Sequence, residues 1–413
     1  MRQRFFSKIA VVIMMIATIV MTACLSNGVT VSPATLELHV GDKQTLTAEI
    51  TSADVTDKTI TWSSNIPLVA TVDPATGEVT AVATGTAIIT ATTSNGKTGS
   101  CTLTVSSDIL PGDVYVAGYY VNASDKGIAA LWKNGLRQDL TNGTNPFPFS
   151  YAYSVFVSDD DVYVAGFNYD GNNKYEPILW KNGVRQNFAY GSGVACSVFV
   201  SGNDVYVAGR VADSGDDNFK PVLWKNGVKQ TLLNAGDGGA SSVFVSGSDV
   251  YVAGYTYNAS NIYVAILWKN GIKYDLSDGA VGAQAYSVYV SGNDVYAAGV
   301  DNDKPVLWKN GVKQTLPVMG TGHAEANSVF VSDNNIYVSG YDNDELVLWK
   351  NGVKQILSAT GESYVLTSSV FVSGNDVYVS GEHKYKPVLW KNGVLQDLID
   401  GSMGGVACSV FVK

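Results

Sequence analysis

The sequence predicts an all-β protein in which a small β-sandwich precedes a closed ring of four-stranded sheets. Three observations predict this class. A set of motifs recurs seven times after residue 113, the array begins and ends in the middle of a repeat, and residues 29–106 alternate apolar and polar side chains in short runs. Helical periodicity is absent after the first two dozen residues, and a hydrophobic content of 46% suits two packed β domains.

The recurring unit is best seen in SVFVSGNDVYVSGEHKYKPVLWKNGVLQDL, from Ser369 to Leu398. Runs of β-branched and aromatic residues such as Val-Phe-Val and Val-Tyr-Val are typical of strands. Spacings of 40 to 48 residues between copies match a four-stranded propeller blade. The tryptophans of the LWKNG motif mark the seven copies: Trp132, Trp180, Trp224, Trp268, Trp308, Trp349 and Trp390.

Two kinds of hairpin turn separate the strands of each copy. Four copies place Gly first in a two-residue turn, for example Gly202-Asn203, which favours a type II′ turn. Asp159-Asp160 and Asp333-Asn334 replace that turn in two copies, and their side chains also tolerate left-handed backbone. Asn-Gly follows Trp-Lys in all seven copies and predicts a type I′ turn.

The array opens at Asp113 with DVYVAG and closes at residues 409–412 with SVFV, so one strand is missing at the front and one is left over at the back. An open solenoid would need polar capping repeats at both ends. A ring instead pairs the last strand with the first copy, which leaves no free sheet edge at the seam. We therefore expect residues 113–413 to form a closed seven-bladed β-propeller, with blade one made of residues 113 to 140 and 409 to 412.

The repeat pattern resembles kelch-type and WD-repeat propellers at the level of architecture. It differs from both, because the kelch double glycine is a single glycine here and no Gly-His…Trp-Asp signature is present. We interpret the seven tryptophans as side chains packed between neighbouring blades, and the seven serines that open SVFV as groups that satisfy backbone atoms near the central channel. A binding ladder of tryptophans is the alternative.

Residues 29–106 contain short alternating runs broken by Gly, Asp, Asn and Pro, which predict a small antiparallel sandwich. The motifs VGDKQTLTA, ITWSSNIPLVATVD, GEVTAVATGTAIITAT and CTLTV closely resemble the bacterial Ig-like group 2 domain. The resemblance implies a spacer or adhesion module without catalytic residues, with Trp62 in its core. A stalk for the propeller is the expected role here, and direct receptor binding is the alternative.

The first 24 residues predict export. Arg2, Arg4 and Lys8 precede an apolar run from Ile9 to Ala23, which is typical of a secretory signal. Met21-Thr22-Ala23-Cys24 resembles the bacterial lipoprotein box, although Met21 replaces the usual leucine. The resemblance implies lipidation of Cys24 and anchoring of the protein at the outer membrane or cell surface, with the membrane contacted through the lipid anchor only.

The remaining cysteines are Cys101, Cys196 and Cys408. Cys196 and Cys408 fall in blades three and one, which are not neighbours, so we expect free buried thiols instead of a disulfide. A net charge of −10 argues against nucleic acid as a partner.

Strands alternate in direction within a blade, so the SGND and KNG turns share one face and the longer connections share the other. Those connections differ in length and are rich in Tyr, Asn, Asp and Gly, which suits sugars or peptides. Candidate ligand-binding residues on this variable face are Tyr119, Phe167, Arg210, Tyr255, Tyr341, Tyr153, Tyr286, His323 and His383.

Enzyme signals are weak. No zinc or EF-hand spacing, sialidase-type Asp box, Ser-His-Asp arrangement or phosphate loop is present, and we predict no cofactor and no metal. The acidic loops 213–217 and 301–303 are interpreted as solvated turns, with weak Ca²⁺ binding as the alternative. We expect a surface lipoprotein whose propeller binds a glycan or protein. The alternatives are a propeller lyase or hydrolase acting on polysaccharide through His323 and His383, and a periplasmic interaction scaffold.

Overall fold

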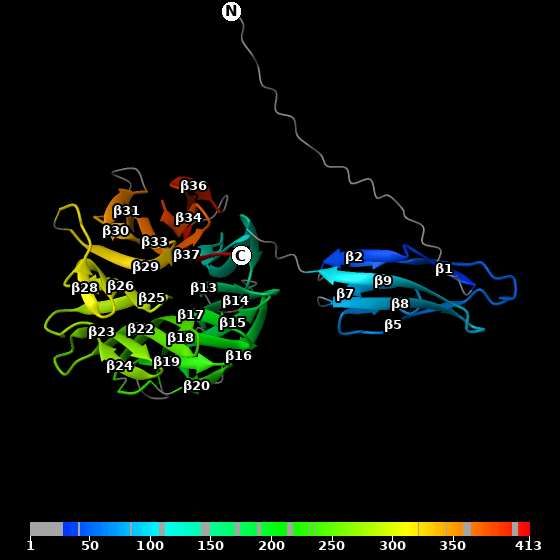
Figure 1. The fold of residues 1–413 in the computed structure, drawn as a ribbon, viewed down its shortest axis with the longest axis horizontal. Coiled ribbons are helices and arrows are strands. Elements are labelled where there is room, and N and C mark those ends of the chain that lie inside the picture. Colours follow the sequence, from blue (N-terminus) through cyan, green and yellow to red (C-terminus); the bar gives the residue numbers. More distant parts are fainter. Residues whose placement is uncertain are drawn as a thin grey trace, which may run out of the picture. The chain divides into compact units, whose positions relative to one another are not determined.

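The computed structural model describes fourteen stretches of the chain: residues 28–39, 42–82, 85–106, 112–141, 149–169, 174–187, 191–212, 218–230, 232–234, 236–320, 322–343, 345–357, 365–398 and 404–413. The predicted signal segment 1–24, with Cys24, lies outside them. The chain divides into two compact units, residues 1–108 and 109–413 (Figure 1). Every regular element in the described stretches is a β-strand, and none of these stretches holds a helix long and apolar enough to cross a membrane.

The first unit is built from nine strands in three sheets. The larger sheets have the orders β2-β9-β8-β5 and β3-β7-β6, and a third pairs β1 with β4. Trp62 lies in the core between them, as the sequence predicted, and Gly77 packs against its ring. The strands are β1 (Val29–Ser32), β2 (Thr35–His39), β3 (Lys43–Thr45), β4 (Thr47–Ile50), β5 (Ile60–Ser64), β6 (Ala70–Val72), β7 (Glu78–Ala81), β8 (Gly85–Thr93) and β9 (Thr98–Ser106).

One strand pair departs from the predicted antiparallel arrangement. Strand β2 runs parallel to β9, with Thr35 opposite Thr102. The chain leaves its pairing with β4 at Ser32, and Pro33 has no N–H to continue that ladder. The backbone N–H of Thr102 then donates to the carbonyl of Ala34 at 2.9 Å, so β2 begins on a different sheet.

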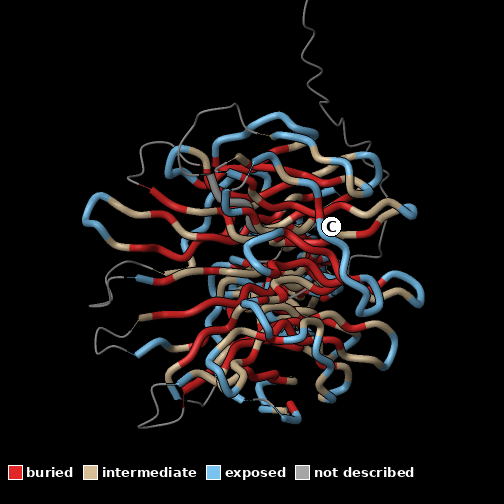
Figure 2. The backbone as a smooth tube through the Cα atoms, turned by 90° about the vertical axis from the view of Figure 1, so that its left-hand side faces the viewer, coloured by how far each residue is buried: buried red, intermediate tan, exposed pale blue. Residues whose placement is uncertain are grey.

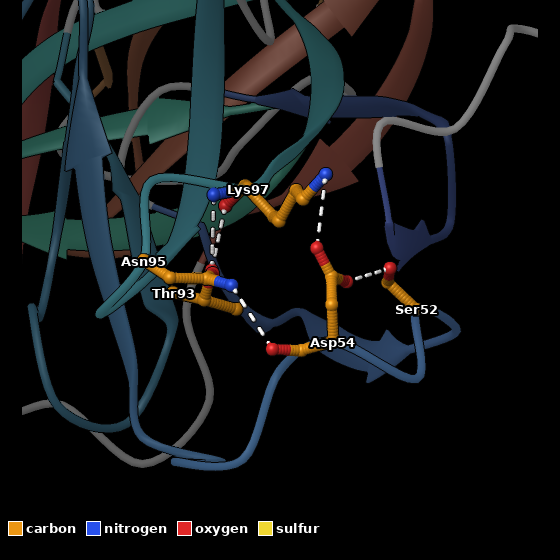
Figure 3. A network of polar contacts seen from close by, with 5 residues as sticks. All are labelled: Ser52, Asp54, Thr93, Asn95 and Lys97. Carbon is orange, nitrogen blue, oxygen red and sulfur yellow. Dashed lines mark hydrogen bonds and ion pairs between the residues drawn. The ribbon is translucent and has the colours of Figure 1, made fainter.

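Two loops at one end of this unit are joined by polar contacts (Figure 3). Lys97 Nζ lies 3.4 Å from Asp54 Oδ2, and Asn95 Nδ2 donates to the Asp54 carbonyl at 3.5 Å. The Ser52 hydroxyl donates to the Asp54 carboxylate and, with Lys97, lowers the pKa of Asp54. Thr93 Oγ1 accepts from the Lys97 amide at 3.0 Å, which closes the turn that carries Lys97. These contacts hold residues 52–54 against residues 93–97.

The second unit contains seven four-stranded antiparallel sheets. Inner strands are β13 (Ser150–Ser158), β17 (Ser192–Ser201), β21 (Gly238–Ser246), β25 (Ala283–Ser291), β29 (Ala324–Ser332), β33 (Val365–Ser373) and β37 (Gly404–Val412). Second strands are β10 (Val114–Val121), β14 (Asp161–Tyr169), β18 (Asp204–Ala212), β22 (Asp249–Tyr257), β26 (Asp294–Asp301), β30 (Asn335–Asp342) and β34 (Asp376–His383).

Third strands are β11 (Gly127–Lys133), β15 (Tyr175–Lys181), β19 (Lys220–Lys225), β23 (Tyr263–Lys269), β27 (Lys304–Lys309), β31 (Glu345–Lys350) and β35 (Lys386–Lys391). Outer strands are β12 (Leu136–Asp139), β16 (Val184–Asn187), β20 (Val228–Gln230), β24 (Ile272–Asp275), β28 (Val312–Thr315), β32 (Val353–Ile356) and β36 (Val394–Asp397). These exposed edges are short, which limits pairing with another chain. Figure 1 shows inner strands such as β17 and β25 toward the middle of this unit. In Figure 2 the buried stretches follow the strands and the exposed ones the turns.

The last strand of the chain completes the first sheet. Strand β37 pairs with β10, with Val412 opposite Val114, so the predicted pairing is confirmed. Lys413 extends the pairing, since its N–H donates to Asp113 and its carbonyl accepts from Gly112. Contacts between inner strands run from β13 through β17, β21, β25, β29 and β33 to β37, and β37 also contacts β13.

Neighbouring inner strands are joined by one aromatic residue and one serine from each. The aromatic rings follow one another with centroids 4.6–5.0 Å apart, and the last contacts the first: Phe156, Phe199, Phe244, Tyr289, Phe330, Phe371 and Phe411. The serine hydroxyls accept from a backbone N–H of the next inner strand at 3.1–3.2 Å, for example Val198 N–H to Ser154 Oγ. The predicted role of the serines is confirmed at six positions: Ser154, Ser197, Ser242, Ser287, Ser328 and Ser409.

All seven repeat tryptophans are at most 2% exposed. Each lies in a hydrophobic cluster with residues of the preceding sheet, as Trp268 does with Tyr206 and Leu223. The prediction that they pack between sheets is confirmed, and this excludes a binding ladder on their rings.

The turns on the face that carries the repeated SGND and KNG segments also agree with the prediction from the sequence. All seven Asn-Gly turns have positive φ at both residues, as type I′ requires. In six repeats the Asp before the second strand pairs with the Lys after the tryptophan, for example Asp161 Oδ2 with Lys181 Nζ at 2.7 Å. The turn asparagine does the same in these repeats: Asn182 Nδ2 donates to the carboxylate of Asp161, and Asn182 Oδ1 accepts from the backbone N–H of Val162. Asn335 replaces Asp in the sixth repeat and keeps the contact with the turn asparagine Asn351.

Each inner strand contains a β-bulge just before its serine. The register shifts by one residue between Ala152 and Ser154 and at the same point in the other sheets. The extra residues are Tyr153, Cys196, Ser241, Tyr286, Asn327, Ser368 and Cys408. Opposite six of the bulges, a Cβ on the second-strand glycine would lie 1.9–2.1 Å from an inner-strand carbonyl oxygen, so only glycine fits. This close approach explains the repeated Ala-Gly or Ser-Gly of the motif.

Candidate functional site

The candidate site, here called the bulge face, comprises the bulged residues and the residues that follow the second-strand glycines. A bulge re-aims side chains, and bulges are frequent next to functional sites. The residues after the glycines are Tyr119, Phe167, Arg210, Tyr255, Val300, Tyr341 and Glu382. Seven of the nine candidates predicted from the sequence occupy bulge or post-glycine positions: Tyr119, Tyr153, Phe167, Arg210, Tyr255, Tyr286 and Tyr341.

The seven sheets are numbered in the chain order of their second strands, so sheet one contains β10 and β37 and sheet seven contains β34. Sheets one and two contribute an aromatic cluster. The rings of Tyr119 and Tyr151 have centroids 3.9 Å apart, and Tyr151 lies 6.4 Å from Tyr153. Phe167 contacts both Tyr151 and Tyr153, at 5.1 and 5.6 Å. Phe167 is only 5% exposed, so it supports the tyrosines and offers almost no surface to a ligand. This corrects its assignment as a ligand-contacting residue, because Phe167 lies directly opposite Tyr151 in the strand pair and is covered by the neighbouring rings.

Sheets three and four contribute a cation surrounded by aromatic rings. Arg210 Nη1 donates to the Tyr255 hydroxyl at 3.2 Å, and the guanidinium carbon lies 5.2 Å from the centroid of Phe219. Tyr255 packs edge-on against Tyr257 and Tyr263. The hydroxyl of Tyr257 donates to that of Tyr263 at 2.8 Å, and this hydrogen bond with burial raises the pKa of Tyr257 to about 12.

Sheets five and six contribute a histidine, a glutamate and two tyrosines. Tyr286 donates to Glu325 Oε1 at 3.1 Å, and His323 Nε2 lies 3.2 Å from the same oxygen. The His323 ring lies 5.5 Å from Tyr341, and its Nδ1 is 3.8 Å from Asp303. Burial, followed by the charge of Glu325, raises the pKa of Tyr286. Glu325 thus holds the two ring systems of these sheets together.

Glu382 of sheet seven is a buried carboxyl group, with 8% of its surface exposed. Burial raises its pKa to about 7. After burial, the charge of Glu382 also contributes to the raised pKa values of Tyr119 and Cys408 in sheet one. Glu382 was not among the residues predicted from the sequence, although its position directly after Gly381 is the one that Tyr119 and Arg210 occupy in their repeats.

Neighbouring groups also affect one another's pKa values. Burial is the main reason that the pKa of Tyr153 is raised, and the nearby Cys408, Cys196, Tyr119 and Arg210 have smaller effects on it. Tyr255 likewise affects the pKa values of Arg210 and Tyr286. The bulge face therefore brings together side chains from all seven sheets.

His383 is the one predicted candidate that lies apart from this group. Successive side chains of a strand point to opposite faces, so His383 and Glu382 diverge. The His383 ring packs against Trp390 in its own sheet, with centroids 6.4 Å apart. His323 and His383 are therefore not brought together as the predicted enzyme alternative requires.

The described cysteines are free thiols, as predicted. Burial raises the pKa of Cys101 and Cys196 to about 11 and that of Cys408 to about 12, so all three are protonated at neutral pH. In the residues that the structure describes, no three His, Cys, Asp or Glu side chains gather as metal ligands. Asp301 pairs with Lys313 at 3.0 Å, and Asn302-Asp303 forms a tight turn with positive φ at both residues. Loop 213–217 lies outside the described residues.

Residues 26–105 match the model of the bacterial Ig-like domain (group 2). The chain thus carries a bacterial Ig-like domain followed by a propeller-like all-β unit. An Ig-like virion protein of Serratia phage KSP90 is 49% identical over 80 residues, 19% of this chain and 31% of the virion protein. A lacto-N-biosidase of Bifidobacterium bifidum is 47% identical over 88 residues, 20% of this chain and 8% of that enzyme. The chain therefore spans less than a third of the length of either relative.

Among solved structures, the β-propeller domain of the Trilobed protease from Pyrococcus furiosus covers 74% of this chain, and this chain covers 94% of that domain. The TM-score is 0.38 and the sequence identity 10%.

Proposed function

We propose that the second unit is a closed seven-bladed propeller that binds a glycan on its bulge face. Closure is supported by the pairing of β37 with β10 and by the circuit of aromatic contacts that returns from Phe411 to Phe156. The observation that carries the binding proposal is the convergence of aromatic and polar side chains from every sheet on one face. A rigid scaffold that presents such side chains is typical of binding sites.

Sugar rings suit this chemistry. The tilted pair Tyr119–Tyr151 offers aromatic surface that is partly exposed, and apolar C–H faces of a sugar pack on such rings. Tyrosine hydroxyls next to those rings donate to and accept from sugar hydroxyls. Tyr119, Tyr151 and Tyr153 are tightly packed, so little side-chain entropy is lost on binding. A protein ligand would use the same rings and is distinguished by experiment.

We expect Tyr119→Ala to weaken glycan binding at least tenfold, about 1.4 kcal/mol. The purified chain is screened on a glycan array and by pull-down, and the affinity for the strongest glycan is then measured by calorimetry. Tyr274→Ala is the matched control, because Tyr274 is 51% exposed on the outer strand β24, away from the bulge face. Equal losses for the two variants, or binding of proteins only, would rule out the glycan assignment.

A polysaccharide hydrolase or lyase is the second candidate function. It is favoured by Glu382, whose pKa of about 7 suits a general acid, and by Glu325 with His323 at hydrogen-bond distance. The test incubates a bound glycan with the chain and follows the release of reducing ends or unsaturated products. If the chain cleaves the glycan and Glu382→Gln abolishes this cleavage, the function is catalysis and not binding alone. Binding without turnover supports the first proposal.

We further propose that the protein is exported and anchored at the bacterial outer membrane or cell surface by a lipid on Cys24. The lipoprotein-like sequence and the bacterial Ig-like domain support this address. Metabolic labelling with an alkyne fatty acid should tag the wild-type chain and leave Cys24→Ser untagged. Protection of the whole chain from protease added to intact cells would favour the periplasmic scaffold instead.

A further inference from the structure

Arg210 is the one cationic residue at the post-glycine positions of the seven second strands. It lies at the middle of sheet three, opposite Val194, with its guanidinium between Phe219 and the Tyr255 hydroxyl. Cys196 and Tyr153 lie near it on two inner strands, and burial raises the pKa of both groups, so they are uncharged at neutral pH. The side chain is thus held in place by neutral neighbours.

No carboxylate in the described stretches forms an ion pair with Arg210. Its Nε is buried and has no hydrogen-bond partner there. A guanidinium stays charged at any physiological pH. A partly buried cation with an unsatisfied donor is unfavourable unless an anion or an acceptor completes it. Arg185 shows the contrast, because its guanidinium pairs with Glu176 on an exposed sheet edge.

We propose that Arg210 binds the carboxylate of an acidic sugar, a uronic or sialic acid residue, on the bulge face. This assignment rests on the proposed glycan binding and specifies its ligand class. A guanidinium forms two parallel hydrogen bonds with a carboxylate, and such charge-assisted bonds are stronger than neutral ones. The aromatic rings beside Arg210 would then pack against the sugar ring that carries the carboxylate.

The single positive charge of Arg210 favours a ligand with one carboxylate over a ligand with many negative charges. A phosphate chain or a nucleic acid needs several cations in a row, and the net charge of −10 repels it. Glu325 and Glu382 contribute carboxyl groups from sheets six and seven. The Glu325 carboxylate disfavours a second anionic group there, and Glu382 adds to this effect above about pH 7, where it ionises. An acidic glycan is thus oriented with its carboxylate toward sheet three.

The test uses matched probes and variants of the full chain. Hexagalacturonate is compared with its methyl ester, which keeps the sugar rings and removes the charges, and 3′-sialyllactose is compared with lactose. Hexaglutamate is the peptide probe. The variants are Arg210→Gln, Arg210→Lys and, as the control for an equal change of net charge, Arg185→Gln. Binding is measured by calorimetry at two salt concentrations.

We expect at least one acidic sugar to bind tenfold or more tightly than its neutral counterpart. Arg210→Gln should abolish this preference, Arg210→Lys should retain only part of it because the planar fork is lost, and Arg185→Gln should behave as wild type. Equal affinity for acidic and neutral partners would overturn the carboxylate site and leave glycan binding intact. Retention of the preference by Arg210→Gln, tighter binding of hexaglutamate, or no binding of either acidic sugar would also overturn it.

Discussion

Deletion of residues 404–413 should abolish cooperative folding of the second unit. The deletion removes β37, and with it Ala407, Val410 and Val412 from the cluster that joins sheets seven and one. It also removes Phe411, which contacts both Phe371 and Phe156, and leaves β10 as an unpaired edge. Burial of four such side chains contributes at least about 5 kcal/mol, which is comparable to the stability of a typical domain.

Urea unfolding followed by tryptophan fluorescence measures this effect, since the repeat tryptophans report on packing between the sheets. A synthetic peptide of residues 404–413 added to the truncated chain should restore part of the transition, because the strand pairs only through non-covalent contacts. A truncated chain with an unchanged unfolding midpoint would show that the pairing of β37 with β10 contributes little, and closure of the ring would then be doubtful.

Gly254→Ala should destabilise the second unit by about 3 kcal/mol or more. A Cβ at this position would lie 2.1 Å from the carbonyl oxygen of Gly239 and 3.0 Å from the Cα of Ala240. Both atoms belong to the backbone of the bulged inner strand, which cannot move without breaking its pairing with β22. The bulge would have to flatten, and Ser241 and Tyr255 would leave the bulge face.

Gly282→Ala is the control for this prediction. A Cβ on Gly282 would meet no heavy atom within 4 Å, and the residue has no positive φ, so alanine should be tolerated within about 0.5 kcal/mol. The free energy of unfolding of both variants is measured by urea titration. Equal stabilities for the two would mean that the second-strand glycines are not required by the bulges.

Much of the fold follows from local patterns in the sequence. The turns were predictable because Asn-Gly and Gly-Asn fix the backbone within two residues. The pairing of residues 409–412 beside Asp113 was predictable because the repeat is cut within a unit. The parallel pairing of β2 with β9 was not predicted, since it depends on where the chain crosses between two sheets at Pro33 and leaves no local signal.

The candidate site was predicted less completely. Counting tyrosines and histidines in the expected loops found Tyr119, Tyr255 and His323 but placed the buried Phe167 among the ligand-contacting residues. The same criterion missed Glu382, because a single glutamate near the end of strand β34 carries no compositional signal. The bulges themselves were invisible, since Ala-Tyr-Ser and Ala-Cys-Ser read as ordinary strand residues. Alignment of the repeats on their glycines would have located Glu382.

The late position of β37 in the chain also determines the order of assembly. Strand β10 leaves the ribosome about 290 residues ahead of its partner, and six other inner strands of similar sequence are made in between. Each of those strands is covalently joined to its own second strand by a two-residue turn, and local hairpins form faster than distant pairings. Hairpin formation thus protects β10 from a wrong partner until β37 has been made. A mutation that slows any one hairpin would leave this unpaired edge free to pair wrongly, and the chain would misassemble or aggregate.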